Sequence, residues 1–388
     1  MSETVHAEPA ALPTPPPQEP AAGPEGRARW CWYTRLLVAV AVAWALFALA
    51  QTLLSGRWWF MLAPDLMPPL LFALVPLLLP LGIVAGRVLR RRVPLRPALG
   101  VGLASLLSLG LGLPWSGLNP HAFDSHGPVP PGALRVMSWN TESWGKDTTP
   151  DKFFSYLKAQ NADVYLLQEC IWTDENEEND RQVDDPGAVY REFPGYYIAV
   201  RGELVTISRY PIVAQPAVGP DQAVSADPTA DWQTVFRAAK VLRTDVKVDD
   251  KVLSFYNVHI PVQVDLGPSA FNPAFYQVLH DRNADRKAQY QGLQADLAAN
   301  KEPFLVAGDF NTSPAMGDLD QLRSRYSDAE QASDSLYPTS WNELGSMRYW
   351  RLDWTFTNSG LKVNQYQLKP VPGVSDHRAQ LIRVSPHG

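Results

Sequence analysis

The hydrophobic residues of this chain follow two different patterns along the sequence. Before residue 119 they form three long runs without a charged residue, at 36–54, 66–86 and 98–118. Beyond residue 132 they form short runs of strand length that alternate with amphipathic stretches. Because about 20 apolar residues can cross the roughly 30 Å hydrocarbon core of a bilayer, the first pattern predicts three transmembrane helices. The second pattern predicts a mixed α/β domain.

Segments of simple composition flank the predicted helices. Residues 1–29 hold seven prolines and show no hydrophobic periodicity, so we expect a disordered tail. Residues 119–132 are rich in Pro and Gly, and we interpret them as a linker. This division leaves a membrane anchor at 30–118 and a folded domain at 133–388.

The distribution of arginine predicts the orientation of the anchor. Three arginines precede the first predicted helix, one separates the first and second, and five separate the second and third. Since basic flanks stay in the cytoplasm, three crossings place residues 120–388 outside it. We therefore expect a multi-pass protein of the cell membrane with an extracytoplasmic domain. The second helix contains four prolines, and the orientation would invert if it did not span.

The folded domain is acidic. The whole chain has a net charge of −6, and residues 121–388 contain 25 basic and 35 acidic residues. A negative surface repels phosphate backbones, so nonspecific nucleic-acid binding is disfavoured, while a local basic groove stays compatible with these numbers. The sequence makes no prediction of the oligomeric state.

Polar groups of one chemical kind mark several strand ends in the domain. Predicted strands cover 134–139, 163–167, 204–208, 236–248, 252–259, 304–307, 352–357 and 379–384, and predicted helices cover 151–160 and 284–298. The polar groups are Asn140, Gln168-Glu169, Asn257-Val258-His259, Asp309-Phe310-Asn311 and Ser375-Asp376-His377. Each group alone is compatible with an ordinary turn, but five of them in order indicate one functional site.

The chemistry of these groups is coherent. Glu and Asn offer the hard oxygen ligands that Mg²⁺ or Mn²⁺ prefers, and the sequence holds no Cys/His cluster of the zinc type. Histidines beside carboxylates can stay protonated and donate to a phosphate oxygen, and an Asp beside an Asn can orient a water molecule. The sequence contains neither a G-x-x-x-x-G-K-[ST] phosphate loop nor a G-x-S-x-G elbow. The pattern therefore favours hydrolysis by water and a divalent metal.

Seven motifs occur in one order between residues 133 and 385: W-N-T-E, L-L-Q-E, S-R-Y-P-I, N-V-H, G-D-F-N-T-S-P, R-L-D-W-T-F and S-D-H. This order resembles the endonuclease/exonuclease/phosphatase superfamily, which includes DNase I-like nucleases, sphingomyelinases and inositol-polyphosphate phosphatases. The resemblance implies a four-layer α/β/β/α sandwich. In such a sandwich two mixed sheets pack face to face, helices lie outside, and a divalent-metal site lies at the rim.

The resemblance also implies roles on the phosphate side of the site. His259 is similar to the histidine that contacts the scissile phosphate, and His377 is similar to a second phosphate-binding histidine. Asp309 resembles the residue that positions or deprotonates the attacking water, and Asn311 resembles the one that binds a phosphate oxygen. Asp353 matches the carboxylate that orients His377, a pairing that should raise the pKa of the imidazole.

On the metal side, Asn140 and Glu169 are similar to the family's metal-binding residues, with Glu169 as the direct ligand. Asp376 resembles a member of the metal and water shell. The metal that the resemblance implies is Mg²⁺ or Mn²⁺.

Together these features predict a membrane-anchored, Mg²⁺-dependent hydrolase of phosphoester bonds. Because the anchor confines the site near the bilayer, a lipid-linked phosphate or pyrophosphate is the leading substrate class. The first alternative is an extracellular nuclease, against which the acidic domain counts. The second is a catalytically inactive binding module, against which the complete set of site residues counts. The aromatic segment 262–283 is either an insertion over the sheet edge or a lip for an apolar substrate, and the sequence leaves both open.

Overall fold

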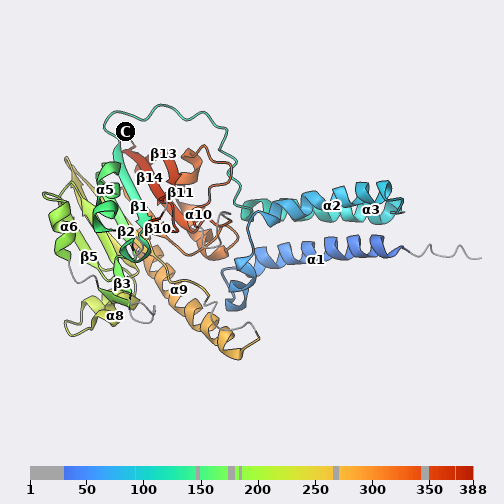
Figure 1. Ribbon diagram of the computed structural model, residues 1–388, viewed down its shortest axis with the longest axis horizontal. Coiled ribbons are helices and arrows are strands. Elements are labelled where there is room, and N and C mark those ends of the chain that lie inside the picture. The colour runs from blue at the N-terminus through green and yellow to red at the C-terminus, as the bar shows by residue number, and fades with distance from the viewer. Residues whose placement is uncertain are drawn as a thin grey trace, which may run out of the picture.

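The protein consists of a rod of three helices and a two-sheet domain at one end of the rod (Figure 1). The computed structural model describes residues 30–91, 93–145, 149–173, 180–182, 186–264, 271–341, 349–371 and 373–387. The rod contains α1 (Trp32–Leu54), α2 (Leu71–Val88) and α3 (Leu95–Gly112), which the turn η3 (Leu113–Trp115) extends. All three are long and apolar enough to cross a membrane.

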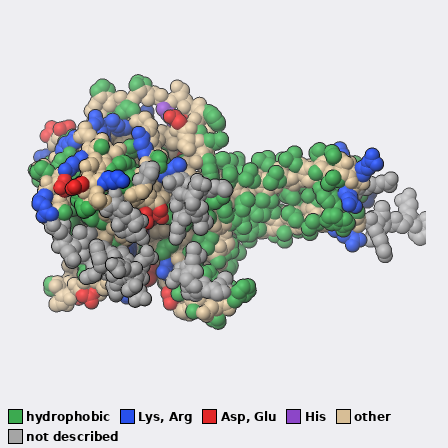
Figure 2. Space-filling view, in the orientation of Figure 1, with side chains coloured by type: hydrophobic (Ala, Val, Ile, Leu, Met, Phe, Trp, Pro, Cys, Tyr) green, Lys and Arg blue, Asp and Glu red, His purple; other side chains and the backbone are tan. Residues whose placement is uncertain are grey.

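The surface of the rod suits a hydrocarbon environment. Hydrophobic side chains cover it, and basic side chains gather at the end far from the domain (Figure 2). Exposed leucines such as Leu46, Leu78 and Leu106 lie along its length. The exposed arginines Arg35 and Arg87 belong to the far end. This arrangement agrees with membrane association.

The second helix begins later than the hydrophobic pattern predicts. It starts at Leu71, whereas the apolar run begins at residue 66. Two prolines at 68 and 69 precede it, and the chain between α1 and α2 forms two short turns, η1 (Trp59–Leu62) and η2 (Pro64–Leu66). Proline lacks the backbone N–H that a helix interior needs, so this apolar segment serves as a connection rather than as helix.

Two mixed sheets form the body of the domain. The first runs in the order β13 (Leu361–Lys369), β14 (Ala379–Pro386), β1 (Leu134–Asn140), β2 (Val164–Gln168), β6 (Leu204–Ser208) and β5 (Tyr197–Arg201). The second runs in the order β11 (Ser327–Asp328), β12 (Asp353–Thr357), β10 (Phe304–Asp309), β9 (Lys251–His259), β8 (Val241–Val248) and β7 (Ile212–Ala214). Each sheet has one parallel pair, β1 with β2 and β9 with β10. A separate pair joins β3 (Ile171–Thr173) and β4 (Asp180–Gln182).

Helices cover the outer faces of the two sheets. They are α5 (Pro150–Gln160) and α6 (Pro186–Glu192) on the first sheet, and α9 (Pro273–Ala299) and α10 (Asp320–Arg325) on the second. The shorter elements are α4 (Glu142–Gly145), α7 (Asp221–Ser225), α8 (Trp232–Ala238), η4 (Gly317–Leu319) and η5 (Ala329–Ala332). The structure confirms the predicted four-layer sandwich.

Alternation along the strands explains these layers. In β1, Val136 points into the core between the sheets, whereas Met137 points out toward α5 and α6. In β10, Leu305 points inward, whereas Val306 packs against α9. Because successive side chains point to opposite faces, an apolar run buried on both faces fits these central strands.

Two elements differ from the pattern-based prediction. The helix α9 begins at Pro273 rather than near residue 284, and the side chain of Asn272 accepts a hydrogen bond from the N–H of Ala274. Asn before Pro is a recognised start of a helix, since Asn caps the free N–H groups and Pro fits the first turn. Residues 236–238 belong to α8 rather than to a strand.

Candidate active site

The predicted site residues come together where the parallel strands end. Asn140 ends β1, His259 ends β9, and Asp309 ends β10. Asp309 pairs with His259 on one side and with Asp353 on the other. Asn140, Asp309 and His259 occupy strand positions whose side chains point toward the other sheet. Their side chains therefore meet between the two sheets.

A glycine makes this meeting possible. Gly308 precedes Asp309 in β10, and a Cβ atom at this position would lie 1.9 Å from the carbonyl oxygen of Val258. No other residue fits so close to the neighbouring strand. The Gly-Asp pair therefore brings β10 against β9 at the level where Asp309 enters the site.

Asp309 lies at the centre of the site. Its Oδ2 atom is 3.0 Å from Nδ2 of Asn140, 3.8 Å from Nε2 of His259 and 3.6 Å from Nε2 of His377. Its Oδ1 atom accepts a hydrogen bond of 2.8 Å from the backbone N–H of Asn311. Burial raises the pKa of the Asp309 carboxyl, and the two histidines offset part of that rise. A carboxylate with a raised pKa is a better proton acceptor near neutral pH.

His377 is held by Asp353. Nδ1 of the imidazole lies 2.8 Å from Oδ2 of Asp353, and both side chains are buried. Burial alone would lower the pKa of His377, but the carboxylates of Asp353 and Asp309 outweigh it and hold the pKa well above the usual value. The raised pKa favours the cationic form of the ring, whose Nε2–H can donate to an anion.

His259 is held by a carboxylate that the sequence motifs do not contain. Nδ1 of His259 lies 3.0 Å from Oε1 of Glu203, which is buried and also forms an ion pair with Lys240. Burial alone would lower the pKa of His259, but Glu203, Asp309 and Glu169 outweigh it and raise the pKa to about 9. Each histidine of the site thus has a buried carboxylate behind it.

Asn311 lies beside His259. Its Nδ2 atom lies 3.3 Å from Nε2 of His259 and donates to the carbonyl of Ile260 at 3.0 Å. The backbone of Asn311 has a φ of 46°, and that of Glu169 has a φ of 52°. Asn adopts this left-handed conformation readily, whereas for Glu169 it costs on the order of 1 kcal/mol. Both residues lie beside Nε2 of His259, with Oε1 of Glu169 at 3.7 Å and Nδ2 of Asn311 at 3.3 Å.

The predicted metal residues divide into two places. Nδ2 of Asn140 donates to Oε1 of Glu169 at 2.9 Å, while its Oδ1 accepts the backbone N–H of Glu142. Asn140 therefore faces the carboxylates with its NH₂ group and orients Glu169. Asp376 lies beside His377, with its Oδ1 3.9 Å from Nε2 of that ring.

The donor set fits a divalent cation. Ligand atoms of Glu169, His259 and Asp309 lie within 4.8 Å of one another, and so do those of Asp309, Asp353 and His377. The carboxylates of the site outnumber its cationic groups even with both imidazoles protonated. The carboxylates are Glu169, Glu203, Asp309, Asp353 and Asp376, and the cationic groups are Lys240, His259 and His377. A hard cation such as Mg²⁺ or Mn²⁺ would balance this charge through oxygen ligands.

A buried polar layer supports the site from below. Nε2 of Gln168 donates to Oδ1 of Asn257 at 2.6 Å, which joins the two sheets. Nδ2 of Asn257 donates to the carbonyls of Leu167 and Val205. Gln168 pairs with Asn140 across β1 and β2, and Asn257 lies two residues before His259 in β9, so these amides fix the separation of the sheets at the site.

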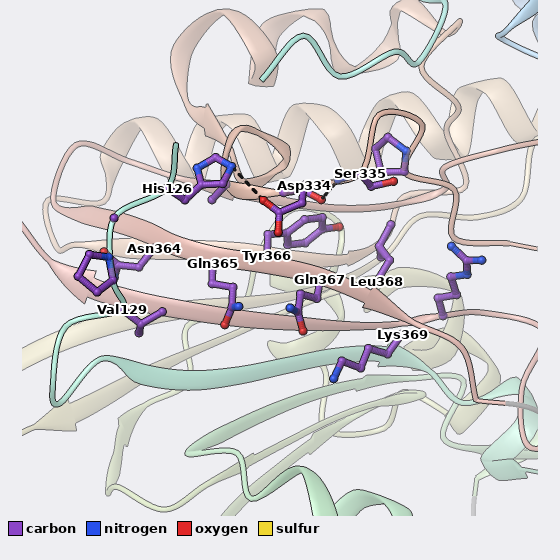
Figure 3. A pocket seen from close by; sticks show the side chains of 16 residues that line it. His126, Val129, Asp334, Ser335, Asn364, Gln365, Tyr366, Gln367, Leu368 and Lys369 are labelled. Atoms are coloured by element: carbon purple, nitrogen blue, oxygen red, sulfur yellow. Dashed lines mark hydrogen bonds and ion pairs between the residues drawn. The ribbon is translucent and has the colours of Figure 1, made fainter. Parts of the chain in front are cut away.

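A separate hollow lies elsewhere on the domain. It measures about 640 Å³ and lies beside β13, where His126 of the linker faces Asp334 (Figure 3). Lys369 and Arg378 also line it, but none of the eight predicted site residues does. We therefore place the candidate active site at the strand ends.

Two stacked mixed sheets with acidic and histidine side chains at the ends of their parallel strands define a phosphoesterase-type sandwich. The chain belongs to the Endonuclease/Exonuclease/phosphatase family, whose family model matches residues 137–377. Membership makes the protein a hydrolase in class. A search of curated proteins finds no match.

Several solved structures are similar to this chain. An endonuclease/exonuclease/phosphatase family protein from Leptotrichia buccalis shares 16% sequence identity over 65% of this chain and 100% of its own, with a TM-score of 0.46. A mannosyl-6-phosphatase from Bacteroides thetaiotaomicron shares 16% over 65% and 100%, with a TM-score of 0.45. Truncated TDP2 from Caenorhabditis elegans shares 15% over 67% and 100%, with a TM-score of 0.44.

Proposed function

We propose that the protein is a membrane-anchored, divalent-metal-dependent hydrolase in which water attacks the phosphorus of a lipid-linked phosphate or pyrophosphate. The observation that carries the proposal is the position of Asp309 between two histidines, each backed by its own buried carboxylate. Such an arrangement offers a proton acceptor and two cationic donors toward one point.

Each side chain of the site has its own proposed role. His259 and His377 donate from Nε2 to the non-bridging oxygens of the phosphate, and the Asn311 amide binds another of these oxygens. Asp309 orients the attacking water and accepts its proton, for which a raised pKa is suited. Asp353 positions His377 and keeps it protonated.

Other side chains of the site would hold a metal. Glu169 is the proposed direct ligand, Asn140 orients it, and Asp376 belongs to the surrounding shell. When bound, Mg²⁺ or Mn²⁺ supplies charge neutralisation for the phosphate and the leaving group. The proximity of the Glu169 carboxylate to those of the site supports this assignment, since ligand atoms of Glu169, His259 and Asp309 lie within 4.8 Å of one another.

The contacts between anchor and domain support a substrate that comes from the bilayer. The indole N–H of Trp350 donates to the carbonyl of Leu66, in the turn between α1 and α2. The ring of Trp350 lies 5.7 Å from that of Trp341, and the indole N–H of Trp341 donates to Asp376 at 2.7 Å. Two indoles thus connect the anchor with the site.

The start of α9 supports the same idea. Phe275 and Leu279 pack against Leu62 of η1, so this end of α9 lies level with the domain end of the rod (Figure 1). Phe271 is 99% exposed and Tyr276 is 46% exposed. Exposed aromatic residues at the end of a membrane-spanning bundle commonly lie at the bilayer interface. We propose that residues 271–283 form the predicted lip, while residues 265–270 lie outside the described residues.

The experiment uses the full chain in phospholipid nanodiscs with Mg²⁺ or with EDTA. It offers a polyprenyl pyrophosphate, a phospholipid and duplex DNA. We expect Mg²⁺-dependent release of phosphate from the polyprenyl pyrophosphate, which His259→Ala and Asp309→Asn abolish. The exposed turn residue Asp249 provides a matched control, since Asp249→Asn should retain full activity.

Two results would change the proposal. Rapid cleavage of DNA alone would overturn the lipid-linked substrate and leave a nuclease. Absence of turnover with all three substrates, together with unchanged metal binding in both variants, would overturn catalysis itself.

A further inference from the structure

The segment that follows Asn311 contacts the ends of all three helices of the rod. Ala315 is buried in one cluster with Phe72 of α2 and Trp115 of η3. Met316 is buried with Leu62 of η1. Pro314 packs against Gly117, just after α3. Residues 314–317, here called the docking segment, therefore fill a socket in the anchor.

Polar groups of the anchor hold the docking segment in this socket. The side-chain N–H of Gln51, at the end of α1, donates to the carbonyl of Ala315 and to Asp65. The hydroxyl of Ser55 donates to the carboxylate of Asp65 at 2.9 Å and accepts the backbone N–H of Gly317 at 2.9 Å. All three of these anchor side chains are buried, where losing a hydrogen-bond partner is costly, so the geometry is strongly specified.

The two backbones touch at a pair of glycines. A Cβ atom on Gly317 would lie 2.4 Å from the carbonyl oxygen of Ser55, and one on Gly56 would lie 2.4 Å from the carbonyl carbon of Gly317. Neither position can take a side chain unless the other backbone moves. The socket therefore fixes the position of the docking segment along the axis of the rod.

A second network joins the docking segment to the catalytic residues. Arg286 of α9 is buried and donates to the carbonyl of Asn311 at 3.2 Å and to the hydroxyl of Thr312 at 2.7 Å. Its guanidinium lies 3.6 Å from Asp318, directly after Gly317. The indole N–H of Trp354 donates to the carbonyl of Thr312. The chain from Asp309 to Asp318 is thus held at both ends.

We propose that the anchor positions the catalytic segment: Gln51, Ser55, Asp65 and Gly56 act as positioning residues that set Asn311 and Asp309 through the docking segment. This inference rests on the proposed function of Asp309 and Asn311. It makes the three helices a structural part of the active site rather than a tether. Asn119 agrees with this, since its buried side chain donates to the carbonyls of Glu330, Ser333 and Ser335 and fixes the start of the linker to the domain.

The test compares Gly317→Ala and Gln51→Met with wild type in the full chain. Gly102→Ala in α3 is the matched control, because a Cβ atom there meets nothing within 4 Å. The activity readout is kcat for Mg²⁺-dependent hydrolysis of the soluble probe bis-p-nitrophenyl phosphate, together with the Mg²⁺ concentration for half-maximal rate. The second readout is hydrogen exchange of the backbone amides of residues 309–318.

We expect Gly317→Ala to lower kcat on the order of 10- to 100-fold, because a shift of about 1 Å in a reacting group has such effects. The half-maximal Mg²⁺ concentration should stay unchanged, since Glu169 lies on another segment. In an Asn311→Ala background the same substitution should change kcat by less than about twofold, because coupled residues are not additive. Exchange in 309–318 should accelerate in Gly317→Ala and Gln51→Met and stay unchanged in Gly102→Ala.

The failures are distinguishable. Suppose that Gly317→Ala lowers kcat by the same factor in the Asn311→Ala background as in wild type, and that exchange in 309–318 does not change. The positioning role is then overturned, whereas the proposed hydrolase activity is not. If wild type does not hydrolyse any phosphoester, the proposed function is overturned. The exchange measurement then decides alone whether the anchor orders the segment.

Discussion

Oδ2 of Asp353 lies 2.8 Å from Nδ1 of His377. Asp353 belongs to β12, which pairs directly with β10, the strand of Asp309. Because the carboxylate occupies Nδ1, the other ring nitrogen is left to face Asp309 at 3.6 Å. The pair therefore determines both the orientation of the ring and the nitrogen that it presents to the site.

Replacing Asp353 by Asn tests this relationship. Asp353→Asn should lower kcat/KM at neutral pH by about 10²-fold or more, because a neutral amide no longer stabilises the imidazolium. Since the pKa of His377 would fall, the deficit should shrink toward acidic pH. The measurement is the pH profile of kcat/KM for bis-p-nitrophenyl phosphate, with Asp249→Asn as the control. A variant profile parallel to wild type at every pH would contradict the proposed role.

Replacing Glu203 separates stability from catalysis. Glu203→Gln leaves Lys240 buried without its partner, and breaking a buried pair in this way costs about 3–5 kcal/mol. The double variant Glu203→Gln with Lys240→Met removes the unpaired ammonium and should recover most of the unfolding midpoint. It should not recover kcat/KM, because the pKa of His259 stays lowered without the carboxylate. Recovery of both quantities would show that Glu203 is only structural.

The sequence predicted the core of the site because its chemistry is local. Asp309 and Asn311 follow an apolar strand and a glycine that the strand pairing requires, and the other predicted groups stand at similar strand ends. Whether these residues play the predicted roles stays a prediction. The family resemblance supplied the four-layer arrangement, which strand periodicity alone does not determine.

Other features could not be read from the sequence, for physical reasons. Glu203 stands in a turn after Gly202, where a carboxylate usually faces solvent, and only the fold brings it behind His259. Gln51 and Ala315 contact each other across 264 positions, and no periodicity records such a pair. The early start of α9 did have a signal, because Asn272 and Pro273 form a helix start.

The buried carboxyl of Asp65 predicts a distinct pH dependence of the protein's stability. Burial raises the pKa of Asp65 to about 7, although Gln51 and Ser55 donate to it. A folded state that holds the proton more tightly loses stability as the pH rises from about 4 through about 7, by about 1.4 kcal/mol for each unit of pKa shift. Asp65→Asn should remove this loss. The unfolding midpoint of the variant should therefore rise relative to that of wild type between pH 5 and pH 8. A difference between the two midpoints that stays constant over this range would exclude the raised pKa.

The arginine distribution predicts where the domain lies. Arg87, Arg90, Arg91 and Arg96 flank the ends of α2 and α3 away from the domain, and basic flanks stay in the cytoplasm. A periplasm-active phosphatase reporter fused after Gly388 should be active, and a cytoplasm-active fluorescent reporter at the same position should be dark. The reverse pair of results would place the domain in the cytoplasm.

Hydrolysis in H₂¹⁸O tests the central claim most directly. Full-length protein with Mg²⁺ should release phosphate from a polyprenyl pyrophosphate with one ¹⁸O atom per turnover in the products, bound to phosphorus, since water attacks phosphorus. EDTA and Asp309→Asn should abolish the reaction, and Asp249→Asn should not. Two results would contradict water attack on phosphorus directed by Asp309. One is ¹⁸O bonded to carbon in a prenyl alcohol product, and the other is ¹⁸O incorporation that Asp309→Asn leaves unchanged.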